Sequence, residues 1–361
     1  MNRRDFFLPR HLLRAAGQIS GLVDALARPL ELQAPVDPEA SLLRFSRPAM
    51  ATTFEILVPF DMPNAAAMAT RALDIIDQLE CQMTVYQPES EVSRINDTAS
   101  LGPVPVEPEL FSLFERAVEL TRQTAGAFDI FAGALSKAWG FFRRQGQVPE
   151  PDALIEVMEC VGMRHVALDD NGKTICFSRP GVEINLGSIG KGHALDRAAA
   201  IFRREREPRS PELVPPPLAA LLHGGHSSVL ALGSQPGRRD GWPVGIRHPE
   251  RGGERLLILN LRDRALGTSA ATYQHLQYNG RRLGHILDPR TGWPAEGVLS
   301  ASATAPTAAE ADALATAFFI LGADGTREYC ECHPEIGAVL MLEGESCPLL
   351  LGRARDELPP A

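Results

Sequence analysis

A helix that is predicted to be apolar on nearly every side places the strongest constraint on the fold of this chain. Residues 308–321 read AAEADALATAFFIL. Thr307 and Glu310 form a capping box, which specifies where the helix begins, and Gly322 is typical of a residue that ends a helix. A helix with so little polar surface is stable only when other elements surround it. We therefore expect residues 308–321 to be buried against a sheet or further helices.

Strand and helix patterns occur in separate groups along the chain. Residues 53–58, TFEILV, are rich in β-branched and aromatic side chains and predict a strand. Helices are expected at 64–82 and 108–124, and a strand pair at 173–186 around the turn Arg179-Pro180-Gly181. Because strands pair locally and helices lie between groups of them, we predict an α+β fold with largely antiparallel sheets and packed helices. Further strands are expected at SSVLALG (227–233), WPVGIR (242–247) and RLLILNL (255–261).

The length of 361 residues fits one large domain with a buried core. Residues 1–44 are expected to form a partly disordered leader and linker. Residues 45–350 are expected to form a single domain, which could comprise two lobes, and residues 351–361 a C-terminal tail. The charged and proline-rich segment 203–217 predicts a surface or disordered insertion within that domain.

The charge and cysteine content exclude some classes of protein. The formal net charge of −9 provides no broad basic face, so a nucleic-acid partner is not expected. Six cysteines in a chain of this length do not form a disulfide framework. Cys330, Cys332 and His333 lie close in sequence, but no second pair of ligands stands at zinc-site spacing. We interpret this cluster as structural or incidental.

The N-terminal residues leave the compartment open. Arg3-Arg4-Asp5-Phe6-Phe7 resembles a twin-arginine export signal, which would direct the protein to the periplasm. Pro9, Arg10, Arg14 and Asp24 interrupt any apolar run, so a leader on a cytoplasmic protein is slightly favoured. No segment is long enough to span a bilayer.

A glycine-rich segment is the first candidate for binding chemistry. Residues 184–196 read INLGSIGKGHALD, a pattern that predicts a strand, a tight turn and a helix. Its glycines would let backbone N–H groups approach an anion, and Lys191 and the start of the helix add positive potential. The segment is neither a Walker A loop nor a G-x-G-x-x-G fingerprint. A tight turn with a surface lysine remains the alternative.

Asp312 and Thr316 are the second candidate. They are four positions apart, so they share one side of the apolar helix. A carboxylate and a hydroxyl at buried positions require partners, and their oxygens suit Mg²⁺ completed by phosphate and water. The alternative is a threonine bonded to its own helix and an aspartate paired with an arginine.

The third candidate is the turn 284–292, GHILDPRTG. It is expected to place His285, Asp288 and Arg290 close together. The imidazole could act as a base and the guanidinium could hold a phosphate. On its own, a solvated turn is the simpler interpretation.

These three segments, in this order, resemble the ApbE-type FAD:protein FMN transferase family. The resemblance extends from about residue 45 to 345, and each matching stretch is short, but their joint order is specific. Upstream and intervening matches are Met50-Ala51-Thr52, YQPESEVSRIN (86–96), Ala127-Phe128-Asp129, Trp139-Gly140-Phe141, Gly224-Gly225, WPVGI (242–246) and Thr268-Ser269.

The resemblance implies an α+β architecture like that of ApbE proteins, related to the T-fold, and an enzyme that uses Mg²⁺. Such an enzyme transfers FMN from FAD to a Thr or Ser hydroxyl of an acceptor protein and releases AMP. His285 is the implied base and Lys191 the implied catalytic cation. By position, the residues implied to contact FAD are Met50, Tyr86, Ala127, Phe128, Asp129, Asn185, Lys191 and Ile286, and those implied around the metal are Ser188, Asp312 and Thr316.

Several positions depart from the family pattern. Asn185 and His226 stand where the family usually has Asp, Ala270 stands where it has Gly, and Ala51 is a minor change. A change from Gly to Ala can reshape a loop where the backbone needs a positive φ. Two alternatives therefore remain: a flavin-binding store or scaffold with weak or no transfer, and an FAD pyrophosphatase that gives FMN and AMP.

Overall fold

A computed structural model describes residues 41–143, 146–204, 218–271 and 275–360. The expected leader up to residue 40 and most of the insertion 203–217 lie outside the described residues. The main element is an eight-stranded sheet whose neighbouring strands all pair antiparallel, as predicted. In sheet order its strands are β1 (Leu42–Ala49), β2 (Thr52–Pro59), β6 (Ala220–Gly224), β7 (Ser228–Leu232), β10 (Arg264–Ala270), β13 (Val298–Ala305), β14 (Gly337–Leu342) and β15 (Leu349–Gly352).

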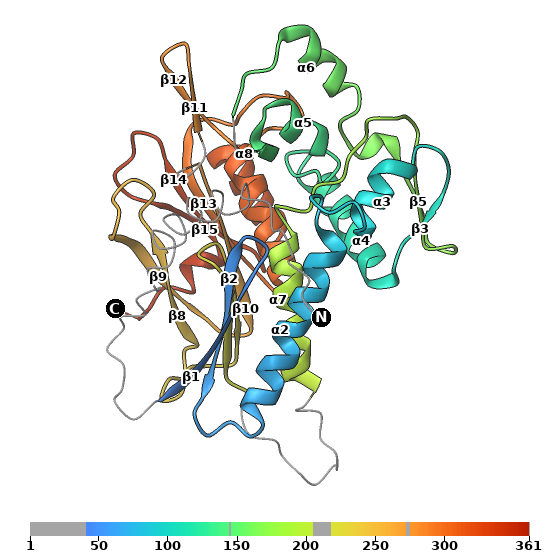
Figure 1. Ribbon diagram of the computed structural model, residues 1–361. Helices are drawn as coiled ribbons and strands as arrows, with labels where there is room; N and C mark the ends of the chain where they lie inside the picture. The colour runs from blue at the N-terminus through green and yellow to red at the C-terminus, as the bar shows by residue number, and fades with distance from the viewer. Residues whose placement is uncertain (1–40, 144–145, 205–217, 272–274, 361) are drawn as a thin grey trace, which may run out of the picture. The chain divides into compact units, whose positions relative to one another are not determined.

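Helices α2 (Ala65–Met83), α7 (Gly190–Arg204) and α8 (Ala308–Cys332) pack against this sheet, and Figure 1 shows them running beside one another. Apolar residues at helical spacing turn one side of α2 into the core. The apolar helix expected at 308–321 is buried as predicted. Gly322, with φ 68° and ψ −164°, ends this first stretch of α8, and a second helical stretch continues to Cys332.

A second group of elements lies between β2 and β6 in the chain. It contains α3 (Glu91–Thr98), α4 (Pro108–Gln123), α5 (Gly133–Ala138), α6 (Pro151–Met158) and the 3₁₀ helices η1 (Phe141–Arg143) and η2 (Met163–His165). Its small sheet has the order β3 (Val104–Pro105), β5 (Thr174–Phe177) and β4 (Val166–Asp169). The expected helices at 64–82 and 108–124 correspond to α2 and α4.

The strand pair expected at 173–186 is wrong in its second half. Only β5 forms, and it pairs with β3 and β4. Residues 182–186 form no strand, because the backbone of Ile184 bonds to the side chain of Asn96 instead of a neighbouring strand. The chain therefore enters the glycine-rich turn from an irregular segment.

Two hairpins complete the fold: β8 (Trp242–Arg247) with β9 (Arg255–Leu261), and β11 (His275–Tyr278) with β12 (Arg281–Gly284). The short helix η3 (Arg353–Arg355) follows β15. One main core joins the sheet to its helices and includes Phe54, Ile56 and Phe318. No helix in the described part of the chain is long and apolar enough to cross a membrane.

Candidate active site

The carboxylate of Asp312 connects three elements. Its Oδ2 accepts hydrogen bonds from the backbone N–H of Gly192 at 2.8 Å and from Ser228 Oγ at 2.9 Å. These donors lie at the start of α7 and in β7, while Asp312 lies in the first half of α8. Burial raises the pKa of Asp312, and the positive charge of Lys191 opposes that rise. The structure thus brings together the first two candidate segments, the glycine-rich segment and the apolar helix that carries Asp312.

Gly192 makes this contact possible because it has no side chain. A Cβ atom at residue 192 would lie 2.0 Å from the carbonyl oxygen of Ala308. No larger residue fits between the two helix backbones at that separation. Ser188 lies partly exposed in the turn that precedes α7.

Thr316 follows Asp312 by one helical turn. Its hydroxyl lies 3.0 Å from Ser269 Oγ in β10 and also donates to the carbonyl of Asp312 at 3.4 Å. One part of the alternative interpretation is therefore correct, because the Thr316 hydroxyl bonds to its own helix. The other part is not, because within the described residues Asp312 bonds to Gly192 and Ser228 and not to an arginine.

The side chains around Asp312 fit a hard cation. Asp312, Thr316 and Ser269 offer only oxygen atoms, which are the ligands Mg²⁺ prefers. Across the described ranges, no three His, Cys, Asp or Glu side chains gather into a metal site. A cation beside Asp312 would need hydroxyl, phosphate and water oxygens to complete its coordination. The sequence analysis did not identify Ser228. It could have been found as a hydroxyl residue in a strand that is otherwise apolar and buried.

A cavity of about 190 Å³ lies at the other end of the glycine-rich segment. Tyr86 and Phe142 form one wall, with their ring centroids 4.7 Å apart and the planes inclined by 28°. Lys137, which is ion-paired with Glu183 at 2.7 Å, forms another part of the lining. Asn185 also lines it and accepts from the Gly187 N–H at 2.8 Å. Tyr86 is 68% exposed, so its ring is accessible to a planar ligand.

Asn96 holds the backbone beside this cavity, and sequence reasoning did not assign it a role. Its Nδ2 donates to the carbonyl of Ile184 at 3.1 Å, and its Oδ1 accepts from the N–H of Ile184 at 2.7 Å. One side chain thus replaces a strand neighbour immediately before Asn185. Asn96 is the last residue of the stretch 86–96 that matches the family, and this match could have marked it as a candidate.

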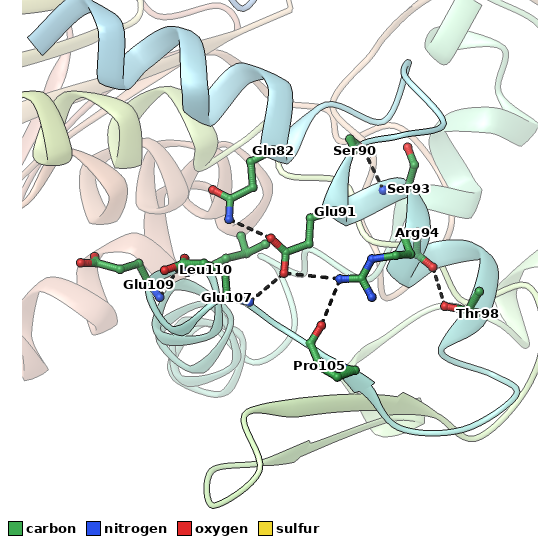
Figure 2. Close-up of polar contacts among 10 residues, drawn as sticks. All are labelled: Gln82, Ser90, Glu91, Ser93, Arg94, Thr98, Pro105, Glu107, Glu109 and Leu110. Carbon is green, nitrogen blue, oxygen red and sulfur yellow. Dashed lines mark hydrogen bonds and ion pairs between the residues drawn. The ribbon is translucent and has the colours of Figure 1, made fainter. Parts of the chain in front are cut away.

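The rest of that stretch anchors α3. Ser90 caps the helix by accepting from the N–H of Ser93 at 3.0 Å. Figure 2 shows Glu91 accepting from Gln82 on α2 and from the backbone N–H of Glu107, which precedes α4. Arg94 donates to the carbonyl of Pro105 at 3.1 Å. These bonds keep α3, and with it Asn96, in a defined position relative to α2 and α4.

Residues 127–129 are buried or half-buried, and Asp129 is bonded to the backbone. Its two oxygens accept from the N–H groups of Phe131 at 2.8 Å and Met163 at 2.9 Å, and burial raises its pKa. Phe128 lies in the core. The nearby Gly126 lies against Arg290, since a Cβ there would be 3.5 Å from Arg290 Cγ. This contact places residues 127–129 next to the turn 284–292.

Within that turn, Asp288 and Arg290 pair with each other. Arg290 donates to Asp288 through its backbone N–H at 2.9 Å and through Nε and a terminal nitrogen, which raises the pKa of the guanidinium. His285 instead lies edge-on to Phe141, with ring centroids 6.3 Å apart. Ile286 is buried, and Trp139 Nε1 donates to the carbonyl of Gly292 at 2.9 Å.

Met50 and three of the positions that depart from the family pattern, Ala51, His226 and Ala270, lie in or between strands of the main sheet. Met50 and Ala51 form the two-residue turn between β1 and β2, both with positive φ (49° and 58°), as such hairpins require. Ala270 is paired with Ser300 in β10 and is not among the described residues with positive φ, so its side chain causes no backbone strain. His226 follows Gly225 in the turn between β6 and β7.

In this α+β fold a glycine-rich helix start meets a buried carboxylate, an arrangement that could hold a phosphorylated ligand. The model of the ApbE family matches residues 50–340, and this chain belongs to that family. The FAD:protein FMN transferase of Treponema pallidum is 31% identical over 281 residues, which covers 74% of this chain and 75% of the relative. That of Haemophilus influenzae is 28% identical and covers 87% of this chain and 90% of the relative. The crystal structure of the ApbE protein from Thermotoga maritima superimposes with a TM-score of 0.78 at 28% identity, covering 89% of this chain and all of that structure.

Proposed function

We propose that this protein transfers FMN from FAD to a Thr or Ser hydroxyl of an acceptor protein, uses Mg²⁺ and releases AMP. The observation that carries the proposal is the bond between Asp312 and the Gly192 N–H, which joins the apolar helix α8 to the start of α7 beside Lys191. In this proposal the Asp312 carboxylate would hold a cation and Lys191 would hold a phosphate of the same ligand. The names of the relatives supply the donor and the type of acceptor.

The reaction exchanges one phosphorus–oxygen bond for another. The acceptor hydroxyl oxygen forms a bond to the phosphorus of the FMN half of FAD. The bond from that phosphorus to the bridging oxygen breaks, and the bridging oxygen leaves with AMP. His285 takes the hydroxyl proton, and Lys191 offsets negative charge on the phosphate oxygens. Mg²⁺ held by Asp312, Thr316 and Ser188 would supply further charge neutralisation.

The flavin half is assigned to the cavity beside Asn185. The stacked ring of Tyr86 offers a flat, partly exposed surface for an isoalloxazine ring. The family resemblance assigns further FAD contacts to Met50, Ile286 and residues 127–129. Asn185 is neutral where an aspartate is usual, so it contributes hydrogen bonds without repelling the phosphates.

One assay tests the proposal against its two alternatives. Purified protein is incubated with FAD, Mg²⁺ and a Thr-containing acceptor peptide, and AMP, free FMN and the peptide mass are followed. A peptide that gains FMN supports transfer. Free FMN with an unlabelled peptide would indicate a pyrophosphatase, and bound, unchanged FAD would indicate a store or scaffold.

Asp312→Ala tests the metal assignment. We expect Mg²⁺-dependent turnover to fall on the order of 10²–10³-fold, as when one electrostatic group is removed from a reacting phosphate or carbonyl. Asp324→Ala is the matched control, since Asp324 is an exposed carboxylate in the second helical stretch of α8, paired only locally with Arg327. Circular dichroism checks that both variants are folded. If Asp312→Ala turns over at the wild-type rate with the same Mg²⁺ dependence, Asp312 is not a metal ligand.

A further inference from the structure

We propose that Asp196 is a positioning residue for the metal site: by fixing the start of α8 against α7, it sets where the Asp312 carboxylate lies. Asp196 is in the middle of α7. Its Oδ1 accepts from the N–H of Ala308 and its Oδ2 from the N–H of Ala309, both at 2.9 Å. The inference rests on the proposed function, because it concerns the site assigned there to Mg²⁺.

Two oxygens bound to two successive N–H groups control more than the distance between the helices. A single acceptor would hold the end of α8 but let the helix turn about that bond. Two acceptors on one rigid carboxylate also fix the rotation of the first turn about its axis. Asp312 is one turn further along α8, so its direction depends on that rotation.

The packing around Asp196 transmits small movements to Asp312. Gly192 and Asp196 are four residues apart and share one side of α7. A Cβ at Gly192 would lie 2.0 Å from the Ala308 carbonyl oxygen, and a Cβ at Gly267 in β10 would lie 2.3 Å from that of Ala311. The first turn of α8 is therefore held on two sides by backbone contacts. A shift there changes the 2.8 Å bond between Gly192 and Asp312 directly.

Another first-turn contact of α8 provides a comparison. Glu310 is also in this turn, but its carboxylate pairs with Arg116 of α4. That ion pair attaches α8 to a different helix and does not involve Gly192. Loss of the Glu310 contact should weaken packing without turning Asp312, whereas loss of an Asp196 contact should do both.

The test replaces Asp196 by Asn and measures Mn²⁺ binding to the protein with FAD present, by electron paramagnetic resonance and without an acceptor. An amide offers one acceptor oxygen, so one of the two helix N–H groups loses its partner. We expect Mn²⁺ affinity to fall on the order of 10-fold, as for other residues that orient metal ligands. FAD affinity measured without metal should stay within about twofold, and Glu310→Gln should leave Mn²⁺ affinity unchanged. Asp196→Glu keeps both oxygens and should bind Mn²⁺ better than Asp196→Asn, but less tightly than the wild type.

The outcomes separate this inference from the proposed function. If Asp196→Asn lowers the melting temperature but binds Mn²⁺ like the wild type, Asp196 is a helix cap and nothing more. If Asp196→Asn does not fold, Asp196→Glu decides the matter, and wild-type Mn²⁺ affinity in that variant overturns the inference. If the wild-type protein with FAD binds no Mn²⁺, the metal assignment fails and this inference fails with it. Mn²⁺ binding without FMN transfer would contradict the proposed reaction alone.

Discussion

At the scale of single residues, Asn96 shows how a side chain can take the place of a strand. It gives Ile184 both an acceptor and a donor, so the backbone before Asn185 stays ordered outside any sheet. The sequence match to stretch 86–96 included Asn96, but only the structure shows what it bonds to. Residue patterns identify which positions matter more readily than they identify the partners, because partners distant in sequence are set by the fold.

Asn96→Ala should weaken both stability and FAD binding. The change leaves the N–H and carbonyl of Ile184 without these bonds, which costs about 1–3 kcal/mol for each unsatisfied group. Urea unfolding measures the stability, and fluorescence titration of FAD without metal measures the affinity. Asn171→Ala, at an exposed position in the turn between β4 and β5, is the control. FAD affinity equal to that of the wild type would show that Asn96 supports the fold without shaping the cavity.

At the scale of elements, β2 and β6 are neighbours in the main sheet although the long, mainly helical segment from α2 to α7 separates them in the chain. Glu55 and His223 are directly opposite each other in this pair, and His223 Nε2 lies 3.0 Å from Glu55 Oε2. The hydrogen bond to His223 lowers the pKa of Glu55 below its ordinary value of 4.5, with smaller contributions from Arg44 and His226. The two strands are therefore joined by side chains as well as by backbone bonds.

This lowered pKa makes the β2–β6 pair sensitive to acid. A carboxyl group whose pKa is lower in the folded state stabilises the fold above its unfolded pKa, and the contribution disappears as the pH falls through the folded pKa. We expect the melting temperature of the wild type to fall more steeply below about pH 4.5 than that of Glu55→Gln. Glu345→Gln, at an exposed turn position, should follow the wild type. If the melting temperatures of the wild type and Glu55→Gln fall equally steeply at acid pH, Glu55 does not have this role.

At the scale of the whole domain, the strands of the main sheet follow one another in chain order. The antiparallel class and the buried helix were predictable, since alternation, capping and apolar content are local properties. Two features were not predictable from local patterns. β6 pairs with β2 from more than a hundred residues away, and β10, RALGTSA, forms from a stretch in which most residues are small. The same limit applies to the site, because Ser228 and Asp196 gain their roles only when β7, α7 and α8 meet.

The C-terminal residues are joined to this sheet by a buried ion pair. Arg264 Nε in β10 lies 2.5 Å from Glu357 Oε1, and the side chains are 9% and 6% exposed. Arg264 also donates to the carbonyl of Glu335 at 2.6 Å, and the N–H of Asn260 donates to the carbonyl of Glu357 at 2.7 Å. The segment that the sequence presented as a tail thus contributes a charge to the interior.

Glu357→Gln should destabilise the whole domain by about 3–5 kcal/mol, because it leaves a buried guanidinium without its counter-charge. Urea unfolding followed by circular dichroism gives this value. The double variant Arg264→Met/Glu357→Met removes both charges and should recover much of the loss, since apolar replacements of buried ion pairs are often neutral. Equal destabilisation in the single and double variants would mean that the pair stabilises the domain through more than charge compensation. Arg355→Gln, on an exposed arginine of η3, should stay close to the wild type.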